Sequence, residues 1–248
     1  MINITRGDKP TSLDIPEIQL YLDEVIAYNQ LSKEEKKKAK EPDAGAYRRS
    51  DVLKAFDRDF YSKCYLTEQK FENSWAMDVE HFKSKSFNQY PLLKYEWQNL
   101  YPCTHDANIS KPTTEPVGGY LDPCELTDDV ECEIVYTLEM GGKAFFDFKN
   151  EGNLKAINTC KLLDKIHNGT SEDSKKKTAE LRLLISKKER DLIDTIMKWQ
   201  RNKLQNNLEE EVRLRGKLKR LLSRKSDFTM LLRSLSCVSE YLPKDFLD

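Results

Sequence analysis

The chain has 248 residues, of which 38% are hydrophobic and 33% charged. This composition is expected of a soluble, helix-rich protein with room for one large domain or two small ones. No apolar run reaches the roughly 18–20 residues needed to span a bilayer, and the N-terminal stretch lacks the apolar core of a signal peptide. We therefore expect a cytoplasmic protein with no membrane partner, whose six cysteines are reduced thiols rather than disulfides.

The net charge of −1 gives no global argument for nucleic-acid binding. Its distribution is uneven, because residues 171–225 contain 17 Lys and Arg against 9 Asp and Glu, an excess of 8, which leaves −9 for the remainder. Such a basic segment could contact phosphates. A solvated face of a long helix of mixed charge explains it equally well.

Hydrophobic spacing predicts the first elements in chain order. These are a short strand-like piece at 2–5, an amphipathic helix at 18–27, an exposed charged segment at 31–40, a helix at 50–64 capped by Ser50 or Asp51, and a strand at 75–82.

The second half is predicted to contain one β-hairpin and then mostly helix. The hairpin pairs residues 132–138 with 143–148 around Gly141-Gly142, and a helix follows at 153–166 and closes at Asn168-Gly169. Helices fill residues 178–248. Gly216 can interrupt the helical region, and Ser226 or Asp227 can cap its last helix.

One stretch, residues 78–111, carries the chemistry. It has the order E-H … N-L … N-x-x-K, with Glu80-His81, Asn99-Leu100, Asn108 and Lys111. A cation held by oxygen ligands offsets the charge that builds on a phosphodiester during hydrolysis, and a neutral imidazole takes the proton of the attacking water. Adjacent residues of a strand point to opposite faces, so a Glu-His pair at a strand end can serve both purposes.

At these residues the chain resembles the HNH endonuclease family. The resemblance is closest to the subgroup that includes PtuB, the nuclease subunit of Septu anti-phage systems, which is also found beside some retrons. It runs over roughly residues 51–184. The matching residues are Val79-Glu80-His81-Phe82, Lys85, Tyr95, Trp97, Asn99-Leu100 and Pro102, with looser matches at 60–64, 121–124 and 162–169.

The resemblance implies a role for each motif residue. His81 would be the general base, and Glu80 and Asn108 would bind one Mg²⁺, with Mn²⁺ an expected substitute. Asn99 would fix the loop that holds His81. Ordinary readings stay open, because Glu80 can be a surface carboxylate and Asn108 a helix N-cap, and His105 or Asp106 can compete with Asn108 as ligand.

Lys85 and Lys111 are candidates to contact the substrate phosphate, and a solvated lysine is the alternative for each. Many HNH proteins hold a structural zinc with two C-x-x-C pairs. Here the first pair reads Cys64 and Thr67, and alanine precedes Asn108. We therefore expect no structural zinc, although a site from Cys64, Cys103, His105 and a fourth ligand is conceivable.

The expected fold is α+β, a small ββα-metal (HNH) nuclease core embedded in a mainly α-helical protein. We divide the chain into an N-terminal helical, partner-docking segment (1–50), the nuclease core with the hairpin (51–150) and a helical C-terminal region (151–248). The expected function is metal-dependent cleavage of nucleic acid, with DNA first, as the nuclease subunit of an anti-phage complex. Two alternatives are an RNA- or tRNA-cleaving effector and an inactive scaffold.

The resemblance also implies an ABC-type or SMC-like ATPase as partner, and a homodimer within the complex is conceivable. The chain contains no G-x-x-x-x-G-K-[ST] motif, which is the phosphate-binding loop of many ATPases. ATP hydrolysis would therefore come from another chain.

Overall fold

The computed structural model describes residues 1–84, 89–139 and 141–248. It is an α+β protein with two small antiparallel sheets. The helices and strands are α1 (Pro16–Gln30), α2 (Lys33–Lys36), α3 (Ser50–Asp59), β1 (Asp78–His81), α4 (Tyr90–Leu93), β2 (Leu100–Cys103), α5 (His105–Ser110), α6 (Val130–Glu133), β3 (Ile134–Glu139), β4 (Lys143–Phe148), α7 (Leu154–Asn168), α8 (Glu172–Lys177), α9 (Ala179–Leu204), α10 (Leu208–Leu222), α11 (Thr229–Arg233) and α12 (Ser236–Tyr241).

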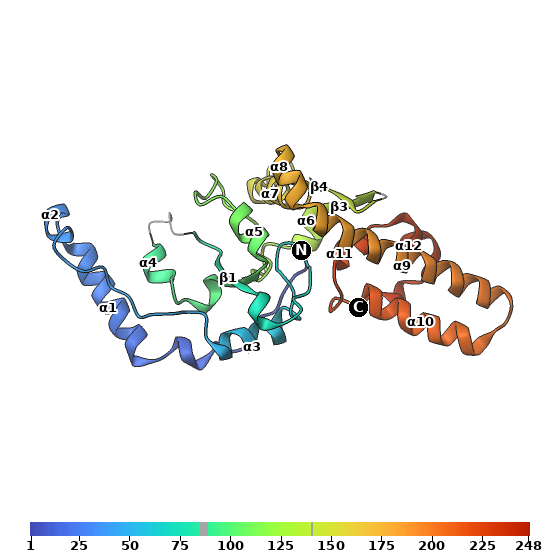
Figure 1. Ribbon diagram of the computed structural model, residues 1–248, viewed down its shortest axis with the longest axis horizontal. Coiled ribbons are helices and arrows are strands. Elements are labelled where there is room, and N and C mark those ends of the chain that lie inside the picture. The colour runs from blue at the N-terminus through green and yellow to red at the C-terminus, as the bar shows by residue number, and fades with distance from the viewer. Residues whose placement is uncertain (85–88, 140) are drawn as a thin grey trace.

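The molecule is elongated (Figure 1). Helices α1 and α2 form one end, the antiparallel pair α9 and α10 forms the other, and β1 lies between them with α5 beside it. None of the helices in residues 1–84, 89–139 and 141–248 combines the length and the apolar character needed to cross a membrane.

The first sheet and the following helix make a ββα unit. Strands β1 and β2 are antiparallel, with Glu80 opposite Tyr101 and His81 opposite Leu100, and α5 follows β2 directly. The expected strand at 75–82 is shorter than predicted, because residues 74–76 form a 3₁₀ turn capped by the side chain of Asn73.

Helix α5 excludes the alternative reading of Asn108 as a helix N-cap. The helix begins at His105, so Asn108 lies inside it and is not the N-cap. It ends at Ser110, and Lys111 takes an extended conformation. The next residue is Pro112, and the residue before a proline is disfavoured in helical geometry. Pro112 therefore falls after the helix.

The second sheet is the predicted hairpin of β3 and β4, and it is confirmed. Residues of β3 alternate between buried and exposed, as expected of a strand with one face on the core. Helix α7 packs against β4. It starts at an N-cap made by Asn153, whose Oδ1 accepts from the backbone N–H of Ala156, and it ends at Gly169, which has a positive φ of 71°.

The helical C-terminal part is also confirmed. Helices α9 and α10 pack against each other, and Gly216 lies within α10 without interrupting it. The start of α11 differs from the prediction. This helix begins after Phe228, which has left-handed backbone geometry, and not after a side-chain cap at Ser226 or Asp227.

Two further expectations for the N-terminal half are wrong. Residues 2–5 form no strand among the residues the structure describes, although the Ile4 N–H donates to the carbonyl of Pro123. Helix α3 stops at Asp59, since Tyr61 and Ser62 have φ near +57°, a conformation that ends a helix of L-residues. Its N-cap is Arg49, while Asp51 accepts from Ser12 instead.

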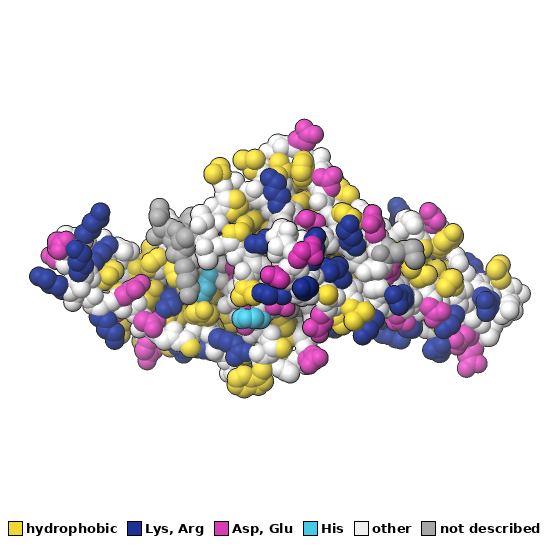
Figure 2. Space-filling model, turned by 45° about the horizontal axis from the view of Figure 1, so that its top comes forward, with side chains coloured by type: hydrophobic (Ala, Val, Ile, Leu, Met, Phe, Trp, Pro, Cys, Tyr) yellow, Lys and Arg dark blue, Asp and Glu magenta, His cyan; other side chains and the backbone are white. Residues whose placement is uncertain are grey.

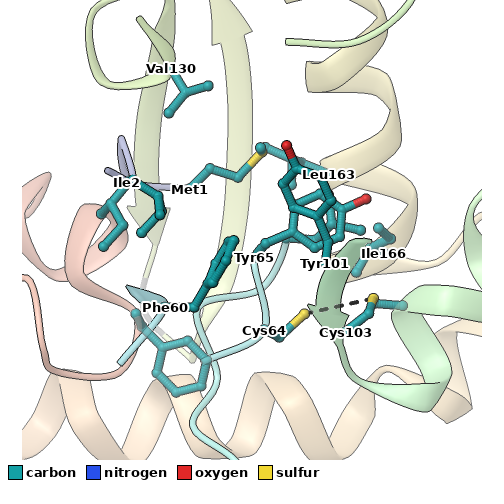
Figure 3. Packing of buried hydrophobic residues seen from close by; sticks show 14 of the residues in the cluster. Met1, Ile2, Phe60, Cys64, Tyr65, Tyr101, Cys103, Val130, Leu163 and Ile166 are labelled. Atoms are coloured by element: carbon teal, nitrogen blue, oxygen red, sulfur yellow. Dashed lines mark hydrogen bonds between the residues drawn. The ribbon is translucent and has the colours of Figure 1, made fainter. Parts of the chain in front are cut away.

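The hydrophobic core joins all three predicted segments. Figure 3 shows Met1 and Ile2 packed in the same cluster as Tyr65, Tyr101 and Leu163. Polar contacts link them too, since Lys63 donates to the carbonyls of Arg224 and Ser226. The segments 1–50, 51–150 and 151–248 therefore share one core, and the role given to each of them stays a prediction.

Candidate functional site

One pocket collects most of the predicted site residues. It has a volume of about 290 Å³, lies between β1 and the segment after α5, and is lined by Tyr47, Val79, Glu80, His81, Ser84, Asn108, Lys111, Pro112 and Thr113. Asn99 lies beneath the loop that follows β1. Lys85 lies outside the described residues. The ββα unit thus brings together residues that are about 30 positions apart in sequence.

His81 ends β1 and is mostly buried, with 7% of its surface exposed. Its Nε2 lies 3.0 Å from the carbonyl oxygen of Lys94. A carbonyl only accepts, so in the neutral ring the proton is assigned to Nε2. Nδ1 is then the basic nitrogen. This is the tautomer that a general base needs, with its second nitrogen fixed by a hydrogen bond.

Two tyrosines further restrict the imidazole. The rings of Tyr47 and Tyr90 meet it edge to face, with centroids 4.6 Å and 5.1 Å away. Tyr47 belongs to the segment before α3, whereas Tyr90 begins α4 and Lys94 directly follows that helix, so two separate segments hold the orientation of His81.

Asn99 has the backbone hydrogen bonds that were expected of it. Its Oδ1 accepts from the N–H of Lys83 at 2.6 Å, and its Nδ2 donates to the carbonyls of Lys83 and Leu93. Because Leu93 precedes Lys94, this amide ties the loop after His81 to the segment whose carbonyl orients the imidazole. Its importance for catalysis stays a prediction.

Glu80 and Lys111 form a buried ion pair. The Lys111 ammonium donates to Glu80 at 2.5 Å and to the carbonyls of His81 and Phe82 at 3.1 and 2.8 Å. The Tyr65 hydroxyl donates to the other oxygen of Glu80 at 2.8 Å. Burial raises the pKa of Glu80, and the bonds from Lys111 and Tyr65 offset part of that rise. Lys111 therefore directs its three N–H groups at protein acceptors in this arrangement, and a phosphate contact would require it to exchange one of them.

A residue that the sequence analysis missed lies next to Asn108. The carboxylate of Asp78 accepts from Nδ2 of Asn108 at 3.2 Å and from Nδ1 of His105 at 3.0 Å. Asp78 and Glu80 are two positions apart on β1, and residues so spaced share a face of a strand. That spacing was the signal in the sequence that could have revealed Asp78.

The oxygen donors near the pocket suit a hard divalent cation. Asp78 contributes a carboxylate and Asn108 an amide oxygen, and Mg²⁺ characteristically uses one or two such carboxylates and keeps several waters. Glu80 offers a second carboxylate that Lys111 already neutralises. Within residues 1–84, 89–139 and 141–248, no group of three or more His, Cys, Asp or Glu side chains has metal-site geometry, so any site here depends on Asn108 and on water.

The two cysteines of the incomplete zinc pattern also meet. Sγ of Cys64 and Sγ of Cys103 are 4.0 Å apart and buried. Figure 3 shows the two sulfur atoms pointing toward each other. Burial acts to raise the pKa of the Cys64 thiol, but hydrogen bonds from Cys103 and Thr67 outweigh it and lower the pKa to about 6. His105, the third ligand considered, bonds to Asp78 instead.

The basic residues do not gather into one patch on the visible face. Figure 2 shows lysine and arginine side chains interspersed with acidic ones along the length of the molecule. Several basic residues of 171–225 are engaged in ion pairs, for example Lys188 with Asp227 and Arg224 with Glu131. This arrangement favours the interpretation of a solvated helical surface.

Comparison of the chain with protein-family models, with curated proteins and with solved structures finds no significant match.

Proposed function

We propose that this protein is a metal-dependent endonuclease of the HNH type that hydrolyses nucleic-acid phosphodiesters. The observation that carries the proposal is the geometry of His81. Its Nε2 is held by a backbone carbonyl, and it shares a pocket with Asn108 and Glu80 on a ββα unit. The order of these residues in the sequence and their convergence in the fold both support this reading.

In the proposed mechanism His81 takes a proton from the attacking water through Nδ1, and Asn99 keeps the loop after His81 in place. Lys111 is a positioning residue that fixes the carboxylate of Glu80. Asp78, Glu80 and Asn108 are the residues that would hold Mg²⁺ or Mn²⁺. When bound, such an ion would offset the negative charge that develops on the phosphate.

The test is a nuclease assay with Mg²⁺ or Mn²⁺ on plasmid, single-stranded DNA and total RNA. We expect cleavage that EDTA stops and that His81→Ala slows by about 10²- to 10⁴-fold, the usual contribution of a general base. Added imidazole should restore part of the activity of His81→Ala, because it replaces the missing base. An unaltered rate in His81→Ala would refute the mechanism.

A partner is part of the proposal. We infer that the chain acts with an ATPase in an anti-phage complex, because the resemblance to the PtuB subgroup implies one. Exposed apolar side chains near the distal end of α9 and α10 support a docking surface there, namely Leu204, Leu208 and Val212. If neither the chain alone nor its mixture with such an ATPase cuts any of the three substrates, a non-catalytic scaffold is the better reading.

A further inference from the structure

A second hollow adjoins the catalytic pocket. Its volume is about 410 Å³, within the size range of small-molecule sites. Its walls include three tyrosines, one lysine and two carboxylates, namely Tyr21, Tyr47, Tyr90, Lys94, Glu41 and Asp43. Tyr47 also lines the catalytic pocket, so the two hollows share a wall, and a ligand of two linked parts could occupy both.

The tyrosines of this wall surround the catalytic histidine. Tyr47 and Tyr90 are each half-buried and meet the His81 ring at interplanar angles of 80° and 75°. Tyr21 is buried, and its hydroxyl donates to the carbonyl of Pro91. This hydrogen bond joins two residues of the lining and holds the Tyr21 ring in place. Half-buried aromatic rings held on several sides offer a rigid surface for stacking.

The charges around the hollow favour a base over a phosphate. Lys94 is neutralised by an ion pair with Asp43 at 2.5 Å, and Glu41 adds another carboxylate. Carboxylates repel the phosphate backbone. They accept hydrogen bonds from the amino groups of bases, as Asp and Glu do with cytosine. The occupant that fits is therefore an uncharged, planar group with N–H donors.

We propose that this hollow receives an unpaired nucleobase of the substrate, next to the phosphate that lies against His81. A base inside a duplex is stacked on both faces and reaches such a site only by leaving the helix. The enzyme would then act on single-stranded or locally unpaired nucleic acid. The inference rests on the proposed nuclease function and adds the substrate class to it.

The test is a binding measurement that needs no cleavage. In EDTA, fluorescence anisotropy would compare a labelled single-stranded oligonucleotide with the blunt duplex of the same sequence, and a single-stranded RNA would form a third arm. We expect single strands to bind more tightly than the duplex. Tyr47→Leu and Tyr90→Leu should each weaken single-strand binding by about 5- to 150-fold, the range measured for one stacked base.

The controls separate stacking from folding. Tyr47→Phe and Tyr90→Phe keep the ring and should bind like the unaltered protein. Tyr241→Leu removes a half-exposed tyrosine of α12, away from the hollow, and should have no effect. Circular dichroism melting would confirm that the leucine variants remain folded. Equal binding by folded leucine variants, or duplex binding as tight as single-strand binding, would overturn the inference.

The two proposals fail differently. If tyrosine-dependent binding of single strands is found but His81-dependent cleavage is not, the base site stands and the nuclease function falls. If Mg²⁺-dependent cleavage by His81 is found but the leucine variants cut and bind normally, the nuclease stands and the base site falls.

Discussion

Asp78 is the residue whose role can be separated most cleanly from its neighbours. It bonds to Asn108 within the site, whereas Asp106 of the same helix α5 is exposed and lines a different cavity. If Asp78 and Glu80 hold the metal, Asp78→Asn and Glu80→Gln should each weaken Mn²⁺ binding by roughly 10-fold or more, as loss of a charged oxygen ligand implies. Calorimetric Mn²⁺ titration measures this, and Asp106→Asn is the matched control. Undiminished affinity in both site variants would place the metal elsewhere.

Lys111 and Lys83 allow a matched comparison of two lysine substitutions. Each bonds to a glutamate, but Lys111 and Glu80 expose only 4% and 6% of their side chains, whereas Lys83 and Glu115 expose 36% and 16%. Removing one partner of a buried pair leaves an uncompensated charge and typically costs about 3–5 kcal/mol, while a more exposed pair contributes about 0–1 kcal/mol. We therefore expect Lys111→Met to lower the free energy of unfolding far more than Lys83→Met, as measured by urea denaturation.

The loss in Lys111→Met should depend on pH. Burial already raises the pKa of Glu80, and removal of the ammonium raises it further. At pH values between the unfolded pKa of Glu80, about 4.3, and its raised folded pKa, folded Lys111→Met binds more protons than the unfolded chain. The stability of this variant therefore falls as pH rises through that interval. The gap between the unaltered protein and Lys111→Met should therefore be widest near neutral pH and narrow toward pH 4. A gap that stays constant over this range would show that Glu80 is not the affected group.

At the scale of elements, the turn of the β3–β4 hairpin contacts α9. Gly141 and Gly142 both have positive φ, 87° and 77°. A Cβ on Gly142 would lie 2.1 Å from the carbonyl oxygen of Arg182 and 2.9 Å from the backbone nitrogen of Ser186, whereas a Cβ on Gly141 meets nothing within 4 Å. Gly141→Ala should cost only the backbone strain of about 1–2 kcal/mol. Gly142→Ala should add a further 1–3 kcal/mol, because backbone atoms of α9 must move. Thermal denaturation of the two variants compares them, and equal losses would contradict this packing.

The same elements show what periodicity can predict. Helices α7 and α9 were predicted because they are long enough for an apolar period to repeat, and the hairpin was predicted because Gly141-Gly142 marks a turn between two β-rich stretches. Helix α5 has six residues and only Ala107 buried, so no period marked its start, and the alternative reading of Asn108 as an N-cap would begin the helix about one turn too late. Asp78 was missed because its contact with Asn108 spans 30 residues. Motif order therefore identified His81, Asn99 and Lys111 as neighbours, while their hydrogen-bond partners emerged only in the fold.

At the scale of the whole molecule, the C-terminal helices are part of the core and not a detachable arm. Ile185, Leu192 and Ile196 of α9 belong to the same hydrophobic cluster as the ββα unit, and Lys63 bonds to the carbonyls of Arg224 and Ser226. Truncation after Ser174 would therefore expose the core and unfold the protein. A test of docking has to use point substitutions at the distal end of α9 and α10 instead.

Leu208 and Val212 of α10 provide that test, because they expose 71% and 69% of their surface while Leu218 of the same helix is fully buried. Leu208→Gln and Val212→Gln should each change the free energy of unfolding by less than about 0.5 kcal/mol, and Leu218→Ala should lower it by about 2–5 kcal/mol. If the exposed side chains dock the proposed ATPase, the double variant should stay folded and retain its metal affinity yet fail to co-purify with that ATPase. Co-purification at the unaltered level would remove the distal end of α9 and α10 from the interface and leave α1, whose Leu20 and Ile26 are also exposed, as the surface to substitute next.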